Sequence, residues 1–164
     1  QAIDNFSYTK ATKMAFQSRR FWEEDHHIYG GISWTDQDIT QIWYPNNGFG
    51  SQQGIFVGAY TYSSSAGQRF ADMNPTARLE AATLEATQIH ESYSDEVSQG
   101  VSVSWPNVPY QKGAWGTSDP GLLLTADDNI YFAGEHLSIL QGWQEGAILS
   151  AYRVINGIVS RDAS

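Results

Sequence analysis

Cysteine is absent from the 164-residue sequence, and charged residues of both signs are few. Without a thiol, the chain can form no disulfide, no thiolate nucleophile and no cysteine-based zinc site. Because disulfides report on redox compartment, their absence also leaves the compartment unpredicted. No apolar run approaches the roughly 18–20 residues that a membrane-spanning helix needs, and we therefore expect no membrane span.

Basic residues are scarce as well, since nine Lys and Arg stand against 18 Asp and Glu and give a formal net charge of −9. Nucleic acids and anionic membranes bind clustered Lys and Arg, so this balance disfavours both as partners. The composition nevertheless indicates a folded chain, because 13% aromatic residues with 16% charged residues is atypical of disorder. The length suits one domain or parts of two.

The chain begins at Gln1 rather than at methionine, and no signal-like segment follows. We therefore expect either a processed chain or one piece of a longer polypeptide. The motifs described below favour the second of these.

Three segments predict β-strands, because residues 8–17, 39–44 and 54–62 combine β-branched and aromatic residues between turn signals. The strongest turn signal is the Pro-Asn-Asn-Gly cluster at residues 45–48. Short connections of this kind favour antiparallel hairpins. Residues 23–25, Glu-Glu-Asp, are expected to form a solvated acidic face.

Two segments predict helices. The first begins at Asn74-Pro75, where asparagine suits the N-cap and proline the first helical position. Its apolar residues at helical spacing are Leu79, Ala82, Ala86 and Ile89. The second runs from about residue 142 to 158, and its apolar stripe comprises Trp143, Ala147, Ala151, Ile155 and Ile158. Between them we expect a Ser- and Gly-rich loop before Trp105 and a short apolar strand at residues 129–133.

The most specific pattern joins residues 130–136, Ile-Tyr-Phe-Ala-Gly-Glu-His, to residues 142–147, Gly-Trp-Gln-Glu-Gly-Ala. It reads as a strand, a glycine, an acid and then a helix that opens on glycine. The unpaired N–H groups of a helix's first turn carry partial positive charge. Gly142 and Gly146 have no side chain, so a flat ring can approach the backbone closely. A reduced flavin, negatively charged near its pyrimidine edge, would suit this arrangement.

These two motifs resemble the closing FAD-binding segment of flavin monoamine oxidases and L-amino-acid oxidases. Four earlier segments resemble the same family in the same order: Thr12-Lys13 with residues 21–25, Tyr44-Pro45-Asn46, Ala59-Tyr60, and residues 105–114. The resemblance extends from about Tyr8 to Ile158. Several motifs in one order are more specific than any one of them alone.

The resemblance implies an α/β (α+β) fragment of a two-domain FAD-dependent amine oxidase, built on a mixed sheet with flanking helices. It implies that residues 1–115 are part of the substrate-binding domain and that residues 116–164 close the FAD-binding domain. The expected partners are the amino-terminal remainder of the same enzyme, a small L-amino acid and oxygen, and a homo-oligomer is expected. The fragment alone should be inactive.

The resemblance also implies roles for individual residues in substrate binding. Tyr60 matches the tyrosine that hydrogen-bonds the substrate α-carboxylate. Tyr62 and Trp115 fall where the family contacts the substrate side chain, and Gly142 and Trp143 match the end of the substrate cage. Trp115 is bulky for its position, so we expect a reshaped side-chain pocket.

Lys13 matches the lysine that holds a water molecule beside the flavin N5 atom, which is the catalytic role that the resemblance implies. Trp105 matches a tryptophan near the flavin, Glu135 the acid close to the ribityl-diphosphate, and the backbone of Gln144 lies near the flavin in the family. The complete implied set of FAD-binding residues is Trp105, Gly134, Glu135, Gly142, Trp143, Gln144 and Ala147.

The reaction that the resemblance implies moves a hydride from the α-carbon of an L-amino acid to flavin N5. The products would be a 2-oxo acid, ammonia and hydrogen peroxide. Two family features are missing from the sequence, namely the Gly-x-Gly-x-x-Gly dinucleotide fingerprint and the arginine that pairs with the substrate carboxylate. We expect both on preceding sequence.

Other interpretations of the same residues remain open. The protein could oxidise a primary amine other than an amino acid, or the aromatic residues could form a carbohydrate-binding module. Spacing alone also permits a glycosidase-like carboxylate pair of Glu24 with Glu135, although no motif supports it. The histidines predict no metal site, because the adjacent pair His26-His27 points to different sides and no second histidine lies one helical turn from His90.

Overall fold

The computed structural model describes residues 6–116 and 121–162. They form two compact units, each described here by itself. The sheet unit is Lys10–Lys112, and the terminal unit combines the described residues of Gln1–Thr9 and Gly113–Ser164. The predicted assignment of residues 1–115 to substrate binding and 116–164 to FAD binding stays a prediction.

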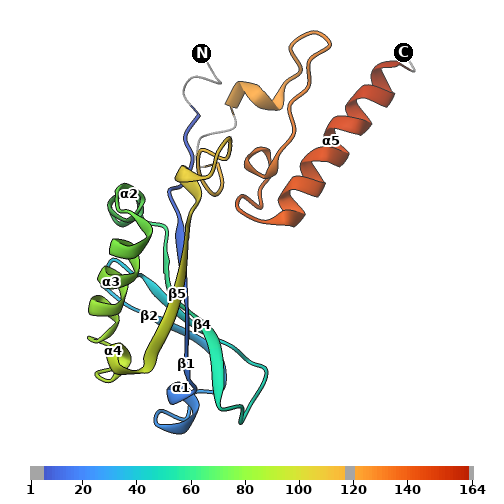
Figure 1. Ribbon diagram of the computed structural model, residues 1–164. Coiled ribbons are helices and arrows are strands. Elements are labelled where there is room, and N and C mark those ends of the chain that lie inside the picture. The colour runs from blue at the N-terminus through green and yellow to red at the C-terminus, as the bar shows by residue number, and fades with distance from the viewer. Residues whose placement is uncertain (1–5, 117–120, 163–164) are drawn as a thin grey trace. The chain divides into compact units, whose positions relative to one another are not determined.

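The sheet unit is built on five strands in the order β2-β3-β4-β1-β5 (Figure 1). Their bounds are β1 Thr12–Arg19, β2 Gly31–Trp34, β3 Gln41–Tyr44, β4 Gln53–Thr61 and β5 Val97–Ser104. Every neighbouring pair in this sheet is antiparallel. The central strand β1 pairs Lys13 with Tyr60 on one side and with Val103 on the other, so these three residues form one row across the sheet.

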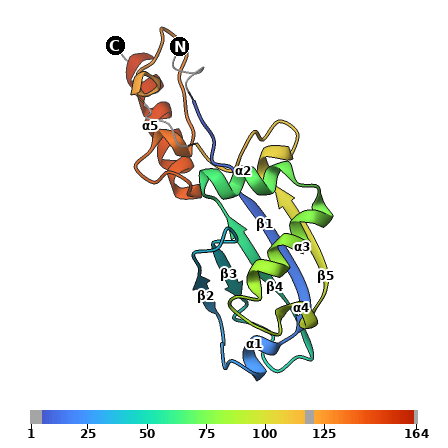
Figure 2. The same ribbon diagram turned by 90° about the vertical axis from the view of Figure 1, so that its left-hand side faces the viewer.

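Four α-helices accompany the sheet: α1 Phe21–Glu24, α2 Ser64–Asp72, α3 Pro75–Ala86 and α4 Tyr93–Glu96. Figure 2 shows α2 and α3 lying across one face of the sheet, where α3 contacts β1, β4 and β5. The predicted start of α3 is confirmed, because the Asn74 side chain accepts a hydrogen bond from the Ala77 amide and Pro75 opens the helix.

Burial along β1 alternates with the two-residue period of a strand. Met14 and Phe16 are buried under the helices, whereas Lys13 is exposed on the opposite face, which we call the open face. The core on the helix side is largely aromatic, and its largest fully buried side chains are Trp22, Tyr93, Phe21, Phe56 and Phe70. The alternation therefore gives the sheet one buried and one open face.

One buried ion pair holds the connection between β3 and β4. The Arg20 guanidinium contacts the Glu23 carboxylate and also donates to the Asn47 carbonyl at 2.9 Å. The other Glu23 oxygen accepts a hydrogen bond from the Gly50 amide at 3.3 Å. The hydrogen bond from Arg20 is the main cause of the lowered pKa of Glu23. The expected solvated face at residues 23–25 is wrong for Glu23, which is 6% exposed.

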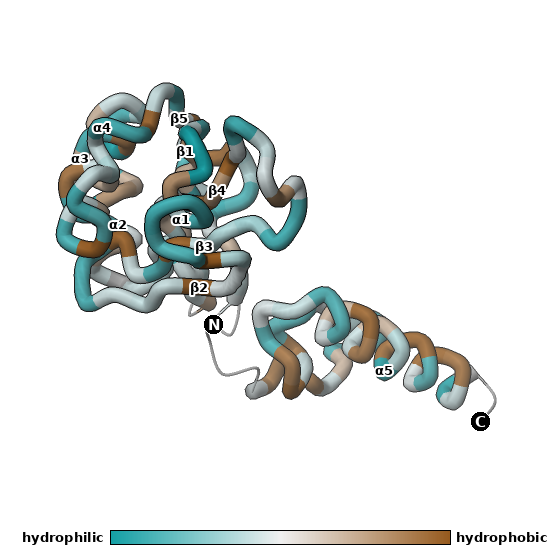
Figure 3. The backbone as a smooth tube through the Cα atoms, turned by 90° about the horizontal axis from the view of Figure 1, so that it is seen from below, coloured by the Kyte–Doolittle hydropathy of each residue, from teal (hydrophilic) through white to brown (hydrophobic). Residues whose placement is uncertain are grey.

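The terminal unit contains the long helix α5, Gln144–Asp162, and two 3₁₀ turns at Gly121–Leu124 and Glu135–Leu137. Figure 3 shows hydrophobic residues recurring along α5. Many of them are exposed: Ile148, Leu149, Tyr152, Ile155, Ile158 and Val159. None of the described helices is long and apolar enough to cross a membrane.

The structure corrects two predictions about elements. The expected loop before Trp105 is strand β5, and the strand expected at residues 129–133 is reduced to a single bridge between Asp127 and Ile130. Strand β2, which is second in the sequence and lies at one edge of the sheet, was not predicted at all. The α+β class with a sheet and flanking helices is confirmed.

His90 is buried in the sheet unit beside Tyr44. Its Nε2 atom lies 2.6 Å from the Tyr44 hydroxyl, which lies 2.9 Å from Ser33 Oγ. The imidazole also contacts the rings of Phe21 and His26. Burial, with a smaller contribution from His26, lowers the pKa of His90 to about 4.

This shift predicts an acid-sensitive stability. The unfolded chain takes up a proton at His90 near pH 6.5, whereas the folded chain resists protonation until about pH 4. The stability that His90 contributes is therefore complete above pH 6.5 and declines as the pH falls to 4, by about 3 kcal/mol. Unfolding measured from pH 7 to 4 should show the advantage of the wild type over His90→Gln shrinking, while the exposed-site control His27→Asn keeps a constant difference.

Candidate functional site

The open face carries a lysine–aromatic cluster at one end of the sheet. Lys13 and Tyr60 are cross-strand partners, and the Lys13 Nζ atom lies 4.5 Å from the centre of the Tyr60 ring. The two side chains face the same way because paired residues of adjacent strands share a face. An ammonium and a phenol are thereby placed together on a surface that the helices do not cover.

Two further aromatic side chains flank Tyr60. The ring centres of Tyr62 and Trp43 lie 5.3 and 6.2 Å from that of Tyr60. Trp43 Nε1 donates to Gln41 Oε1 at 2.6 Å, and Gln41 Nε2 donates to the Tyr62 hydroxyl at 3.0 Å. The buried amide of Gln41 therefore links Trp43 to Tyr62, and both rings lie beside Tyr60.

Burial raises the pKa of Tyr60, and Tyr62 raises it further. The Tyr60 hydroxyl consequently stays protonated at neutral pH and can donate a hydrogen bond to an anion. A carboxylate placed here would meet both a phenol donor and the positive charge of Lys13.

Trp105 lies at the same end of the sheet. It directly follows β5, whose last residue Ser104 pairs with Thr12, and its amide donates to the Ala11 carbonyl at 3.0 Å. Its side chain is half-buried. The structure thus places Trp105 at the end of β1 that carries Lys13.

The remaining predicted site residues belong to the terminal unit. The Glu135 carboxylate accepts one hydrogen bond from the Gly116 amide at 2.8 Å and a second from the Gly142 amide at 2.6 Å. A methyl group added at Gly142 would lie 3.6 Å from the Trp115 ring. The structure therefore brings Trp115, Glu135 and Gly142 together, and their predicted roles toward substrate and FAD stay predictions.

The first turn of α5 follows this cluster. Gly142 has a φ of +78°, a conformation that favours glycine, and the next residue, Trp143, is 68% exposed. Gln144 begins the helix, and Ala147 is also exposed. Gly134 is tied to the same helix because its amide donates to Ser150 Oγ at 3.1 Å.

These residues fit a flavin in two respects. A side chain at Gly142 would occupy the space beside the Trp115 ring, so glycine keeps a place for a flat group there. The exposed entrance of a 19-residue helix also offers backbone N–H groups to a negatively charged edge. Gly142, Trp143 and Gln144 carry no charged side chain, which is compatible with both features.

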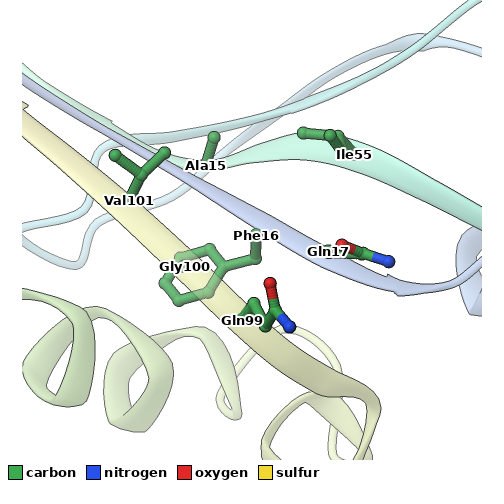
Figure 4. Close-up of a pocket in the computed structure, with 7 residues that line it drawn as sticks. All are labelled: Ala15, Phe16, Gln17, Ile55, Gln99, Gly100 and Val101. Atoms are coloured by element: carbon green, nitrogen blue, oxygen red, sulfur yellow. The ribbon is translucent and has the colours of Figure 1, made fainter.

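Figure 4 shows a hollow on the sheet that involves none of the predicted site residues. Its lining residues are Ala15, Phe16, Gln17, Ile55, Gln99, Gly100 and Val101. It lies along β1 away from Lys13, and its polar groups are side-chain amides, so it offers no titratable group for catalysis. Among the described residues, no group of three His, Asp or Glu side chains could hold a metal ion.

A family model described as flavin containing amine oxidoreductase matches residues 1–158 of the sequence. The chain belongs to this family. Membership confirms the predicted resemblance and supports FAD, the predicted cofactor, because the family is described as flavin containing.

Curated relatives of this chain include several L-amino-acid oxidases. It is 31% identical to a putative L-amino-acid oxidase of Bacillus subtilis over 94% of this chain and 34% of the relative. It is 31% identical to the L-amino-acid oxidase of Mus musculus over 93% of this chain and 25% of the relative. It is 29% identical to a flavin-dependent L-tryptophan oxidase of Lentzea aerocolonigenes, covering 99% of this chain and 37% of that protein. The chain thus spans between a quarter and about a third of their length.

Two solved structures share the fold. A putrescine oxidase redesigned in its cofactor binding superimposes with a TM-score of 0.77 at 14% identity, over 98% of this chain and 37% of that one. Cyclohexylamine oxidase from Brevibacterium oxydans gives a TM-score of 0.71 at 18% identity, over 97% of this chain and 37% of that one. These likenesses confirm the predicted fold of an amine oxidase fragment.

Sequence reasoning missed Gln41, which hydrogen-bonds Trp43 and Tyr62, and Trp43, which lies beside Tyr60. The available signal was the two-residue alternation in β3, which puts Gln41 and Trp43 on one face. Gly116 was missed as a partner of Glu135, and no sequence signal indicates that contact. The roles of the predicted site residues toward substrate and FAD stay predictions.

Two glycines of helix α5, one at its entrance and one near its other end, allow a matched pair of substitutions. At Gly146, an added methyl group would collide with the Leu140 carbonyl oxygen and with Ser138 Oγ, so Gly146→Ala should destabilise by about 1–3 kcal/mol. At Gly157 in the same helix, the methyl would meet only the Tyr131 ring, at an ordinary 3.6 Å. Gly157→Ala should therefore stabilise by about 0.5–1 kcal/mol.

Urea unfolding of both variants measures these opposite signs. The FAD content of purified Gly146→Ala protein should also fall, because the shifted residues 138–140 border the helix entrance. Equal stability of the two variants would contradict the close approach at Gly146.

Proposed function

We propose that the protein containing this chain oxidatively deaminates an L-amino acid to a 2-oxo acid, ammonia and hydrogen peroxide. The observation that carries this choice is the position of Lys13 Nζ over the Tyr60 ring on the open face, 4.5 Å from the ring centre, where burial raises the pKa of the Tyr60 hydroxyl. A phenol donor next to an ammonium group suits an α-carboxylate, which a simple amine lacks. The names of the L-amino-acid oxidase relatives support the same substrate class.

When bound, FAD supplies the acceptor for the substrate hydride and passes the electrons to oxygen. The residues proposed to hold it are Trp105 and, in the terminal unit, Gly134, Glu135, Gly142, Trp143, Gln144 and Ala147. The chain's own contribution is then orientation, exclusion of water and placement of charge.

Tyr60 would donate its hydroxyl proton in a hydrogen bond to the substrate carboxylate and so orient the α-carbon. Trp115 and Trp143 would provide apolar walls that exclude water. An ammonium group is costly to desolvate, so such walls favour the neutral amine, whose lone pair assists departure of the hydride. Lys13 would hold a water molecule through its ammonium group on the open face.

The main alternative is oxidation of a primary amine without a carboxylate. The two solved structures that share the fold are named after amines, putrescine and cyclohexylamine. At 14% and 18% identity, however, they indicate the fold alone. The carbohydrate-binding alternative has no support from the family match.

A substrate comparison distinguishes the two oxidase activities. The complete protein should be yellow and should release peroxide with one or more L-amino acids. Each amino acid is compared with the amine that its decarboxylation gives, so that the pair differs only by the carboxylate. A higher kcat/KM for the amines would overturn the proposal of an amino-acid substrate.

Tyr60→Phe should weaken L-amino-acid binding by about 1.5–3 kcal/mol, because it removes a charge-assisted hydrogen bond and retains the ring. Binding of the matched amine should barely change. The measurement is substrate affinity from anaerobic flavin bleaching. Tyr29→Phe removes a hydroxyl from an exposed tyrosine elsewhere in the sheet unit and serves as the control. An unaltered amino-acid affinity in Tyr60→Phe would remove Tyr60 from the carboxylate site.

Lys13→Met should slow the oxygen-dependent half of the cycle about a hundredfold, since a positioned proton-transfer group contributes at least that factor. The substrate-dependent half should change far less. Stopped-flow absorbance separates the two halves, and Lys112→Met, at an exposed lysine of the same unit, controls for loss of charge. Equal slowing of both halves would argue against the proposed water-holding role.

A further inference from the structure

Strand β4 has one more residue than its neighbour β1 just before the lysine–aromatic cluster. On one side of this irregularity, Ala15 of β1 pairs with Val57 of β4. On the other side Met14 pairs with Ala59, so Gly58 lies between the two pairs and faces no residue of β1 on its own. Two residues of one strand opposite one residue of the other define a β-bulge. The burial of β4 agrees, because Gly58 and Ala59 are both buried, whereas regular alternation would bury only one of them.

The bulge decides which residues of β4 reach the open face. Before it, odd-numbered residues such as Ile55 are exposed there; after it, the even-numbered Tyr60 lies opposite Lys13. A regular ladder without the bulge would put Ala59 opposite Lys13 and would turn Tyr60 toward the face that the helices cover. The single extra residue therefore determines whether the tyrosine and the lysine meet.

The packing around the bulge leaves no room for a side chain at residue 58. A methyl group added at Gly58 would collide with the Tyr93 hydroxyl and would lie 2.6 Å from Cδ2 of Phe16. Tyr93 is fully buried, and its hydroxyl has no hydrogen-bond partner among the described residues, so it acts here by filling space. Gly58 has no left-handed φ. The missing Cβ, rather than backbone freedom, is therefore the reason for glycine at this position.

We propose that Gly58 is a positioning residue, whose bulge turns Tyr60 onto the open face beside Lys13 and whose place under Tyr93 only glycine fits. The consequence for substrate binding rests on the proposed function, since it needs Tyr60 to bind the α-carboxylate. The register of β4 against β1 does not depend on that function.

Pairs of introduced cysteines measure the register directly, because this chain has no cysteine of its own. In the complete protein, Lys13→Cys with Tyr60→Cys should form a disulfide on mild oxidation, because directly paired residues on one face bring their Cβ atoms close together. Lys13→Cys with Ala59→Cys should not, because Ala59 faces the buried side of the sheet. Peptide mapping identifies the bond. A first pair that cross-links no faster than the second would overturn the bulged register.

A substitution at the bulge tests the need for glycine. Gly58→Ala should slow the cross-link between positions 13 and 60 about tenfold, since overpacking a core destabilises the bulged register by that order. Gly100→Ala is the matched control: its methyl would also approach the Phe16 ring, at 3.0 Å, but Gly100 pairs directly with Phe16 in a regular part of β5 (Figure 4). Unchanged cross-linking in Gly58→Ala would overturn the requirement for glycine.

Removal of the Tyr93 hydroxyl provides a rescue. Tyr93→Phe loses no hydrogen bond to a described residue and enlarges the space at position 58. In the Gly58→Ala protein it should therefore restore part of the cross-linking rate. If Gly58→Ala alone does not fold, this double variant takes its place in the measurement. A double variant that cross-links no faster than Gly58→Ala, or that does not fold either, would overturn the role of Tyr93.

A kinetic measurement separates positioning from a merely structural role. The readout is the ratio of kcat/KM for an L-amino acid to kcat/KM for the amine that its decarboxylation gives. Gly58→Ala should lower this ratio about tenfold, as expected when a charge-assisted hydrogen bond is lost, whereas Gly100→Ala should not. Adding Tyr60→Phe to Gly58→Ala should lower it no further, because both changes remove one interaction. A lower unfolding temperature with an unchanged ratio would overturn the positioning role.

The two kinds of measurement fail separately. If Tyr60→Phe by itself leaves the ratio unchanged, or if the complete protein binds no flavin, the proposed function is overturned. The cross-links would still support or overturn the bulge, because they report only which residue of β4 lies opposite position 13.

Discussion

The two-residue alternation of strand β1 is the constraint on which the sheet unit depends. Because β1 lies between β4 and β5, every second side chain is committed to the core that α3 covers. The intervening residues are committed to the open face by the same geometry. A one-residue slip of β1 would exchange Met14 with Lys13, burying an ammonium and exposing a core residue. The hydrophobic core thus holds the lysine beside Tyr60, although neither residue belongs to that core.

The terminal unit is organised by a different principle. Its site residues lie on turns and at a helix entrance, where backbone amides rather than a hydrophobic layer need partners. Glu135 satisfies two of these amides, and Gly142 and Gly146 allow close approaches that a side chain would block. In the terminal unit, a carboxylate and two glycines therefore position the site residues, as the alternation of β1 does in the sheet unit.

Local signals in the sequence predicted α3, because an N-cap asparagine and a following proline act within one turn of helix. They failed for β5, whose Ser and Gly residues have low strand propensity and which forms because β1 pairs with it. Local signals also failed to predict the burial of Glu23. Its partner Arg20 is close in sequence, but both side chains are buried against the backbone of Asn47 and Gly50, which are distant in sequence. Predicted site residues on paired strands, such as Lys13 and Tyr60, lie next to one another in the structure, while their roles stay predictions. The hydrogen bonds of Gln41 to Trp43 and Tyr62, and those of Glu135 to two glycine amides, were not predicted, because they depend on distances that only folding determines.

The strand expected at residues 129–133 and the exposed side of α5 have one physical explanation. A strand needs a neighbour to satisfy its backbone N–H and C=O groups, and within the described residues this segment has only the bridge between Asp127 and Ile130. Among the described residues, the apolar side chains of Ile148, Tyr152 and Ile155 on α5 are likewise exposed, although the apolar face of a helix is usually covered. Relatives of the family are about three to four times as long as this chain. We therefore expect the remainder of the same enzyme to supply both a neighbouring strand and a cover for α5, so that the apolar pattern of residues 129–133 reflects a pairing completed outside this chain.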